Sequence, residues 1–283
     1  MQYSQGLPGV ILEKEKQNIY IDTTQESYSQ DLESAYEHYL TEDFDYFAIS
    51  QDYAAGLYEF LHNASLAGKS AFIKGHTIGP ISFGLTVTDQ NKRASIYNQE
   101  FCDCLLKVLS IKARWQIRKL RSACGAAKII IFIDEPYLVS VGSSFFNIQQ
   151  DQVKKMLNEV IAAIHQEGAF AGIHCCGNTD WSIVLKTDVD ILNFDAYNYL
   201  DNLFLYREEL NSFLKRHGVL AWGIVPTTID GALPSAKVLQ EKMSKQKGPC
   251  LITPSCGLSG LALQRAEEAL CLASSLAKSL PLA

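Results

Sequence analysis

Three separated segments of the chain carry residues that commonly bind soft metal ions, and each follows a short apolar stretch typical of a buried β-strand. The segments are Ile173-His174-Cys175-Cys176-Gly177, Asn193-Phe194-Asp195 and Pro254-Ser255-Cys256-Gly257. Alternate side chains of a strand share a face, so His174 and Cys176 point to one side and Cys175 to the other. A His-x-Cys pair with a distant cysteine, Cys256, predicts a zinc site of the catalytic kind, whose fourth position is open or filled by a carboxylate.

These residues also have simpler structural interpretations. A histidine after a strand is often a core residue, and adjacent cysteines often fill small apolar spaces. Disulfides are a device of small secreted domains, so in a chain of this size paired cysteines more often bind metal. The remaining cysteines are interpreted as buried apolar residues: Cys102, Cys104, Cys124, Cys250 and Cys271.

Length and composition predict one large domain over residues 1–283. The chain has 283 residues, of which 47% are hydrophobic and 20% charged, enough to build a barrel-sized core. Its formal net charge of −6, with no dense run of Lys or Arg, argues against a nucleic-acid partner, because phosphate binding needs clustered cations.

The N-terminus predicts neither a signal peptide nor a membrane anchor. Met1 is followed by the polar segment Gln2-Tyr3-Ser4-Gln5, and the longest apolar stretches have the length of strands. We therefore expect a cytoplasmic protein without a membrane partner.

The elements that must position the metal-binding segments form a repeating pattern. Short apolar runs alternate with longer stretches of helical periodicity, which is typical of parallel βα units. The runs are Tyr46–Ser50, Ala71–Gly75, Lys128–Asp134, Ala169–His174, Val189–Phe194, Val219–Val225 and Cys250–Pro254. The pattern predicts an α/β fold, a TIM-like (β/α)8 barrel, where chemistry lies at the carboxyl ends of the strands.

Seven runs are one fewer than a closed barrel needs, so either the barrel lacks its first strand or the sequence pattern leaves one strand unrecognised. Val10–Glu13 and Ile19–Asp22 instead predict an N-terminal β-hairpin, an extension over residues 1–25, followed by a helix around Glu26–Leu40. Further helices are expected at Gln99–Ala123, Gln149–Glu167, Ser235–Lys245 and Leu263–Lys278.

Four motifs in order give the chain a family resemblance. They are Ile133-Asp-Glu-Pro-Tyr-Leu, Gly172-Ile-His-Cys-Cys-Gly-Asn-Thr, Trp222-Gly-Ile-Val-Pro-Thr and Thr253-Pro-Ser-Cys-Gly-Leu. Together they resemble the C-terminal catalytic barrel of cobalamin-independent methionine synthase and its relatives in the uroporphyrinogen decarboxylase-like superfamily, including methylcobamide:coenzyme M methyltransferases. The likeness runs from about Tyr46 to the end of the chain.

The resemblance implies roles for individual residues. It makes His174, Cys176 and Cys256 ligands of Zn²⁺, and Asp195 a fourth, carboxylate ligand. Asp134 would hold the amino group of homocysteine, with Glu135 beside it. Gly79 would belong to a turn where the backbone approaches the active site.

Two departures from the family concern the methyl donor. The family's opening strand, which ends in a Gly-Ser-Leu-Pro-like segment, is not found, and Thr227 and Thr228 stand near the place of a histidine used in folate-dependent methyl transfer. The resemblance therefore implies a methylated corrinoid, a methylcobamide carried on a partner protein, as the donor. The acceptor would be a small thiol, with homocysteine favoured by Asp134.

Several alternatives stay open at this point. Asp195 is also a suitable cap for the next helix, and Asp-Glu-Pro also suits an ordinary helix start. His76 is interpreted as an ordinary polar residue at a strand end. The chain could instead be a uroporphyrinogen decarboxylase-like or coenzyme M methyltransferase-like enzyme, or a non-catalytic barrel that binds zinc or a corrinoid protein.

Overall fold

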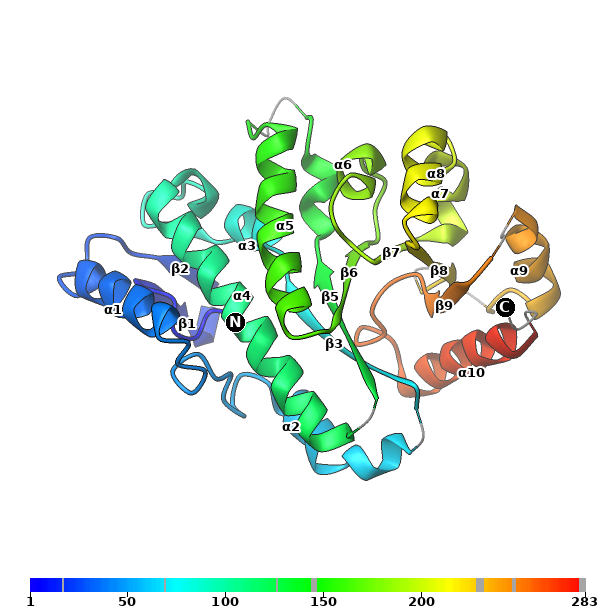
Figure 1. Cartoon of the computed structure of the whole chain (residues 1–283), viewed down its shortest axis with the longest axis horizontal. Coiled ribbons are helices and arrows are strands. Elements are labelled where there is room, and N and C mark those ends of the chain that lie inside the picture. The colour runs from blue at the N-terminus through cyan, green and yellow to red at the C-terminus, as the bar shows by residue number, and fades with distance from the viewer. Residues whose placement is uncertain are drawn as a thin grey trace. The chain divides into compact units, whose positions relative to one another are not determined.

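The computed structural model describes residues 1–16, 18–68, 70–125, 127–143, 147–227, 232–245 and 248–279. The chain forms two compact units. Unit 1 comprises Met1–Tyr137 with Ile148–Ala171, and unit 2 comprises Leu138–Asn147 with Gly172–Ala283. Figure 1 labels the α-helices and most of the strands of both. A single domain over residues 1–283 stays a prediction.

The predicted N-terminal hairpin is confirmed in unit 1. Strands β1 (Val10–Glu13) and β2 (Asn18–Ile21) pair antiparallel, with Val10 opposite Ile21. The carboxylate of Glu13 closes the turn by accepting hydrogen bonds from Lys16 Nζ at 2.7 Å and Asn18 Nδ2 at 3.0 Å. A short strand, β4 (Thr88–Asp89), extends this sheet parallel to β2.

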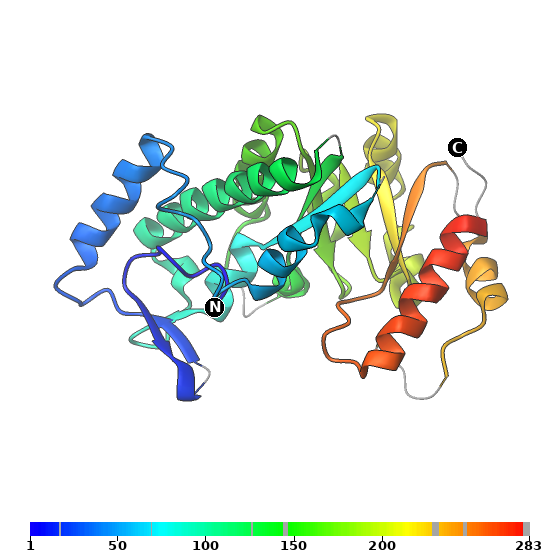
Figure 2. The ribbon, with the colours of Figure 1, turned by 90° about the horizontal axis from the view of Figure 1, so that it is seen from below.

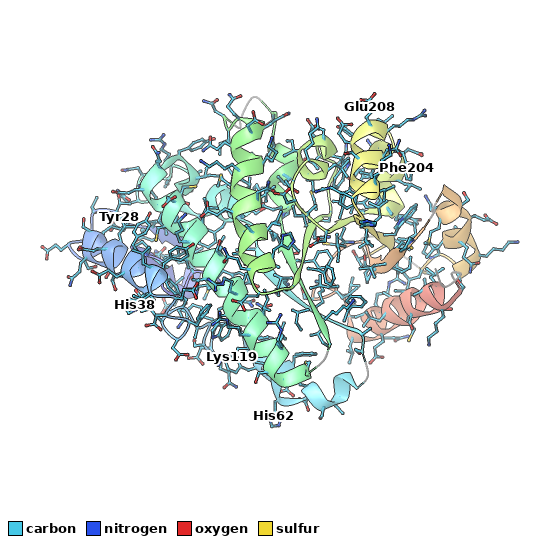
Figure 3. All side chains as sticks on the ribbon, viewed as in Figure 1. Tyr28, His38, His62, Lys119, Phe204 and Glu208 are labelled. Atoms are coloured by element: carbon cyan, nitrogen blue, oxygen red, sulfur yellow. The ribbon has the colours of Figure 1, made fainter. Side chains whose placement is uncertain are left out.

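Helix α1 (Tyr28–Leu40) follows the hairpin, close to the predicted Glu26–Leu40. Tyr28, Leu32 and Ala35 are buried at the three- and four-residue steps of one helical face. Near the other end His38 stacks on the ring of Tyr46 with centroids 3.9 Å apart. Figure 3 labels Tyr28 and His38 on this helix.

The predicted parallel strands of unit 1 are β3 (Phe72–Ile78) and β5 (Lys128–Asp134). They pair in register, so that Ile78 lies opposite Asp134 at their carboxyl ends. Helix α4 (Gln99–Cys124) packs against both strands and against α5 (Gln150–Gln166), which runs beside it in Figure 1. The other two α-helices that the structure describes in unit 1 are α2 (Ala55–His62) and α3 (Pro80–Thr86).

The strand predicted at Tyr46–Ser50 is wrong, because this segment is irregular. Phe47 and Ile49 are fully buried, which accounts for the apolar pattern. Their backbone carbonyls accept hydrogen bonds from side chains: Lys112 Nζ donates to Phe47 O at 3.0 Å, and Tyr58 Oη to Ile49 O at 2.8 Å. Side-chain donors thus replace a strand ladder in satisfying buried backbone groups.

Side chains also close the edge of β3 that does not face β5. The backbone N–H of His76 donates to Gln116 Oε1 at 3.0 Å, and Gln116 Nε2 donates back to His76 O at 3.0 Å. Tyr3 Oη donates to the same carbonyl at 2.7 Å. A Cβ on Gly75 would lie 2.0 Å from Gln116 Oε1, so glycine at this position lets the amide reach the strand.

In unit 2, parallel strands pair in the order β6 (Phe170–Cys175), β7 (Ile191–Phe194), β8 (Val219–Val225) and β9 (Cys250–Pro254). The first two residues of β6 are assigned to unit 1. Trp181, Phe194 and Trp222 form a buried aromatic cluster with neighbouring ring centroids 6.0 Å apart. Such pairs contribute about 0.5–1.5 kcal/mol beyond the burial of their area.

Helices cover the strands of unit 2. They are α6 (Trp181–Leu185), α7 (Ala196–Leu203), α8 (Arg207–Lys215), α9 (Ala236–Lys242) and α10 (Leu263–Ser279). The last two confirm helices predicted from periodicity. Helix α10 packs against β9 and α9, as Figure 2 shows.

The predicted α/β class with parallel strands is therefore confirmed, and six of the seven predicted strands form within the described residues. A closed (β/α)8 barrel stays a prediction. In the part of the chain that the structure describes, no helix combines the length and apolar character needed to cross a membrane.

Candidate metal centre

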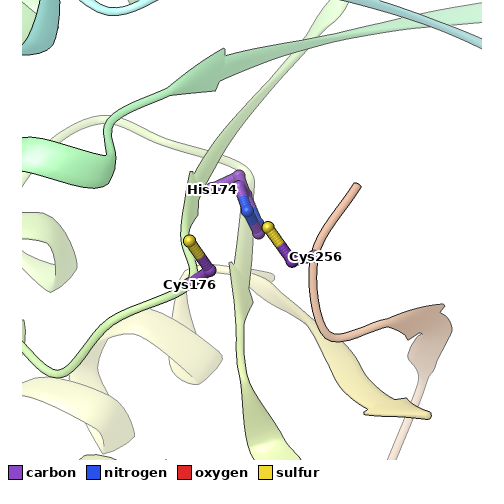
Figure 4. A group of neighbouring side chains, drawn as sticks. All are labelled: His174, Cys176 and Cys256. Atoms are coloured by element: carbon purple, nitrogen blue, oxygen red, sulfur yellow. The ribbon is translucent and has the colours of Figure 1, made fainter. Parts of the chain in front are cut away.

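The structure brings the three predicted donor residues together in unit 2. His174 lies on β6, Cys176 directly follows that strand, and Cys256 follows β9. One ligand atom from each lies within 4.8 Å of the other two, in the only such group of three among the described residues. Figure 4 shows these side chains in close proximity, with His174 on β6 and the cysteines on the segments that follow β6 and β9. Imidazole and thiolate donors at this separation fit a zinc ion.

Strand alternation keeps the intervening cysteine out of the group, as predicted. Cys175 is fully buried, and its thiol donates to Gly177 O over 3.5 Å. His174, Cys176 and Cys256 are instead partly exposed, so that solvent or a ligand can reach them. The two adjacent cysteines thus have different surroundings.

Asn193, in the strand next to His174, holds the imidazole in place. The two residues are register partners on β6 and β7, and His174 Nδ1 lies 2.6 Å from Asn193 Oδ1. The amide nitrogen of Asn193 donates to Ala221 O at 2.8 Å and to Thr253 Oγ1 at 2.9 Å. With 7% of its surface exposed, the asparagine is a buried link between four strands.

A bend directly after β9 places Cys256. Ser255 N donates to Val225 O at 2.8 Å, and Ser255 Oγ accepts from Thr227 N at 3.2 Å. A Cβ on Gly223 would lie 2.6 Å from Phe194 O and 2.9 Å from the Ser255 Cα, so only glycine allows this approach. Thr228, the other threonine noted in the sequence, lies outside the described residues.

The surroundings of Cys256 favour its thiolate. Its hydrogen bond with His174 lowers the pKa of the Cys256 thiol to about 7, and the hydrogen bond with Cys176 acts in the same direction. Burial opposes both effects. The site therefore supplies a deprotonated sulfur near neutral pH, which is the form that binds metal.

Asp195 is not in the group of donor atoms. Its Oδ1 accepts from Asn198 N at 3.0 Å and its Oδ2 from Asn198 Nδ2 at 2.7 Å, so the carboxylate caps the N-terminus of α7. The side chain is buried, at 6% exposure. The cap corresponds to the alternative interpretation of the sequence, and a metal role for Asp195 stays a prediction.

In unit 1, Asp134 ends β5 beside a histidine. Its Oδ2 lies 3.3 Å from His76 Nδ1, and 34% of the Asp134 side chain and 49% of the His76 side chain are exposed. The pair is accessible and can bind a polar group by charge-assisted hydrogen bonds. Substrate binding by Asp134 stays a prediction.

Glu135 and Gly79 form one structural contact in unit 1. Glu135 is fully buried: its Oε1 accepts from Ile81 N at 2.9 Å, and its Oε2 accepts from Ser82 N at 2.8 Å and Ser82 Oγ at 2.6 Å. Burial raises the pKa of Glu135 to about 7, and the hydrogen bonds lower it in part. A Cβ on Gly79 would lie 2.1 Å from the Glu135 carboxyl group. The contact anchors α3, and substrate roles for both residues stay predictions.

Sequence reasoning missed Asn193 and gave no role to His76. Asn193 lies two residues before Asp195 and therefore faces the same side of β7, which was a usable signal. The pairing of β7 with β6 was also needed, because it places Asn193 beside His174. For His76 the signal was that β3 and β5 belong to consecutive βα units. Their parallel strands end at the same edge, so polar residues near the two strand ends lie close together.

Comparison with known proteins gives no family. No protein-family model and no curated protein matches the sequence. The chain is similar to a crystal structure from Bacteroides thetaiotaomicron assigned as an α-L-fucosidase, with 11% sequence identity and a TM-score of 0.33. The similarity covers 86% of this chain and only 65% of that protein's length. A likeness at this TM-score carries no argument about fold or function.

Proposed function

We propose that the protein is a zinc-dependent methyltransferase that moves a methyl group from a methylated corrinoid, carried on a partner protein, to a thiol, with homocysteine as the favoured acceptor. The observation that supports it best is the convergence of His174, Cys176 and Cys256, with their ligand atoms within 4.8 Å of one another. The thiol and the corrinoid rest on the resemblance of the sequence motifs to the methionine synthase family.

The donor set fits zinc chemically. Two thiolates and one imidazole are typical zinc ligands, and three protein ligands leave a position for an exogenous group. His174, Cys176 and Cys256 would hold the ion. When bound, zinc supplies the Lewis acidity that keeps a coordinated thiol deprotonated at neutral pH.

The protein's own residues account for the rest of the proposal. The lowered pKa of Cys256 makes one ligand available as thiolate, and Asn193 orients His174. Asp134 would orient an amino-acid substrate by pairing with its ammonium group. In the net reaction the methyl carbon leaves cobalt for the thiol sulfur, the cobalt keeps the electron pair of the broken bond, and the thiol proton goes to solvent. Asp195 as a resting fourth ligand belongs to this proposal as a prediction.

A decisive test measures zinc and methyl transfer on the same preparation. We expect about one zinc per chain by elemental analysis, and methionine from methylcobalamin and homocysteine. Methyltetrahydrofolate should be a poor donor, since Thr227 stands near the place of the family's acid–base histidine. Protein without zinc contradicts the proposal, and faster turnover with the folate donor contradicts the donor assignment.

A non-catalytic zinc protein is the second candidate. It is favoured by the engagement of Asp195 with Asn198 rather than with the donor group. Stoichiometric zinc without methyl transfer from either free methylcobalamin or a methylated corrinoid protein would select this candidate.

A further inference from the structure

Asn193 makes a set of hydrogen bonds that fixes the orientation of its amide. Its Nδ2 lies 2.8 Å from Ala221 O and 2.9 Å from Thr253 Oγ1. A backbone carbonyl can only accept, so the amide atom facing Ala221 must be the donor nitrogen. Rotating the amide by 180° would put two acceptors against each other. The oxygen Oδ1 is therefore the atom that faces His174.

That orientation determines which nitrogen of His174 carries a proton. Asn193 Oδ1 lies 2.6 Å from His174 Nδ1, and an amide oxygen can only accept. Nδ1 must therefore donate its hydrogen, which leaves the lone pair of the neutral ring on Nε2. Histidine ligands of metals commonly donate their other ring N–H to such an acceptor, which fixes the tautomer and the ring orientation.

We propose that Asn193 is a positioning residue of the metal centre: it selects the tautomer of His174 that offers Nε2 as the ligand, and holds the ring toward Cys176 and Cys256. This inference rests on the proposed zinc site and deepens it. Asn193 does not touch the metal and acts through His174. Thr253 contributes by occupying one hydrogen of the amide, and Ala221 by occupying the other.

A purely structural role for Asn193 makes different predictions. The amide nitrogen links β7 to β8 and β9, so in a purely structural role its loss would lower the stability of the sheet without changing the affinity for zinc. A structural role requires both contacts of Asn193 Nδ2 and does not depend on the hydrogen bond between Asn193 Oδ1 and His174 Nδ1. The positioning role requires an acceptor on Nδ1, which aspartate also provides.

The experiment compares Asn193→Leu, Asn193→Asp and Thr253→Val with the unaltered full chain. Zinc affinity is measured by competition with a chromophoric chelator, Co²⁺ binding by its visible spectrum, and folding by circular dichroism. We expect Asn193→Leu to weaken zinc binding about 10- to 100-fold and to change the cobalt spectrum. Asn193→Asp keeps the acceptor for Nδ1 but sets its second oxygen against Ala221 O, so it should lower stability while restoring zinc affinity to within a few-fold. Thr253→Val should have the smallest effect on zinc affinity.

A folded Asn193→Leu variant with unchanged zinc affinity, or an Asp variant as weak as the Leu variant, would overturn the role of Asn193. Zinc missing from the unaltered protein would instead overturn the proposed function itself. If the Leu variant does not fold, ¹⁵N-histidine NMR of the unaltered zinc-loaded protein decides. Protonated Nδ1 on His174 supports the role, and protonated Nε2 with metal on Nδ1 refutes it.

Discussion

Unit 1 and unit 2 use the carboxyl ends of their parallel strands in different ways. In unit 2 the polar side chains at the strand ends converge, and Asn193 uses its amide to support His174. In unit 1 the carboxylate of Glu135 accepts hydrogen bonds from backbone N–H groups of α3, while Asp134 and His76 remain partly exposed. A polar side chain at a strand end is thus available for chemistry only where nearby backbone groups do not already form hydrogen bonds with its polar atoms.

The largest effect that would sharpen this comparison comes from the cysteines of unit 2. Cys176→Ser and Cys256→Ser should each lose most of the bound zinc, because a serine hydroxyl is a much poorer zinc ligand than a thiolate. Cys175→Ser is the matched control and should keep its metal, since that thiol faces Gly177 O. Elemental analysis after gel filtration measures all three. Equal loss in the three variants would remove the distinction between adjacent cysteines.

The next effect concerns the dependence of stability on pH through Glu135. Its pKa is raised from 4.5 to about 7, so between these values the folded protein holds a proton that the unfolded chain lacks. The associated stabilisation is fully present below pH 4.5 and is lost as the pH rises through 7. A shift of this size corresponds to a change in unfolding free energy on the order of 3 kcal/mol.

Glu135→Gln should therefore flatten the unfolding free energy between pH 4.5 and 7.5, measured by urea denaturation. Asp151→Asn is a suitable control, because 93% of the Asp151 side chain is exposed. An unchanged slope in the Gln variant would mean that Glu135 is ionised throughout, and that unit 1 holds a charged carboxylate in its interior.

Asp134→Asn tests whether unit 1 has a binding residue at all. Losing a hydrogen bond to a charged partner costs about 1.5–3 kcal/mol, so kcat/KM for homocysteine should fall roughly tenfold to a hundredfold, mainly through KM. Zinc content should stay constant. Coenzyme M, whose sulfonate would be repelled by Asp134, should be a poor acceptor for the unaltered protein. Full activity of the Asn variant would argue against homocysteine.

The smallest effect is steric. Gly79→Ala should lower the unfolding free energy by about 1–3 kcal/mol, because the new Cβ would lie 2.1 Å from a Glu135 side chain that three hydrogen bonds hold in place. Gly56→Ala, in α2 with nothing within 4 Å, is the control and should be neutral or stabilising by up to about 1 kcal/mol. Thermal unfolding of the two variants measures the difference. Equal melting temperatures would show that the Glu135 side chain moves aside for the new Cβ at little cost.

The sequence predicted those features that depend on local periodicity. The alternation of β6 separates His174 and Cys176 from Cys175, and the apolar periods of α4, α5 and α10 marked those helices within a few residues. The convergence of Cys256 with His174 and Cys176, at the end of β6, followed from the rule that parallel strands end at one edge.

Features that depend on tertiary hydrogen bonds could not be predicted in this way. Phe47 and Ile49 look like strand residues because they are buried, and only the structure reveals that Lys112 and Tyr58 satisfy their carbonyls. Glu135 resembles a substrate-binding residue, since nothing local indicates that Ile81 and Ser82 bind it. Asn193 required knowledge of which strand lies beside β6.

The amide of Gln116 has a further consequence for the behaviour of the protein in a crowded solution. Its oxygen and nitrogen pair with the backbone N–H and C=O of His76, as the backbone of a neighbouring strand would. Gln116 does this from 40 positions away in the sequence. A foreign strand that tried to dock in register there would have to displace a buried side chain and leave its polar atoms unsatisfied. Gln116, together with the hydroxyl of Tyr3, thus protects β3 from edge-to-edge pairing at His76.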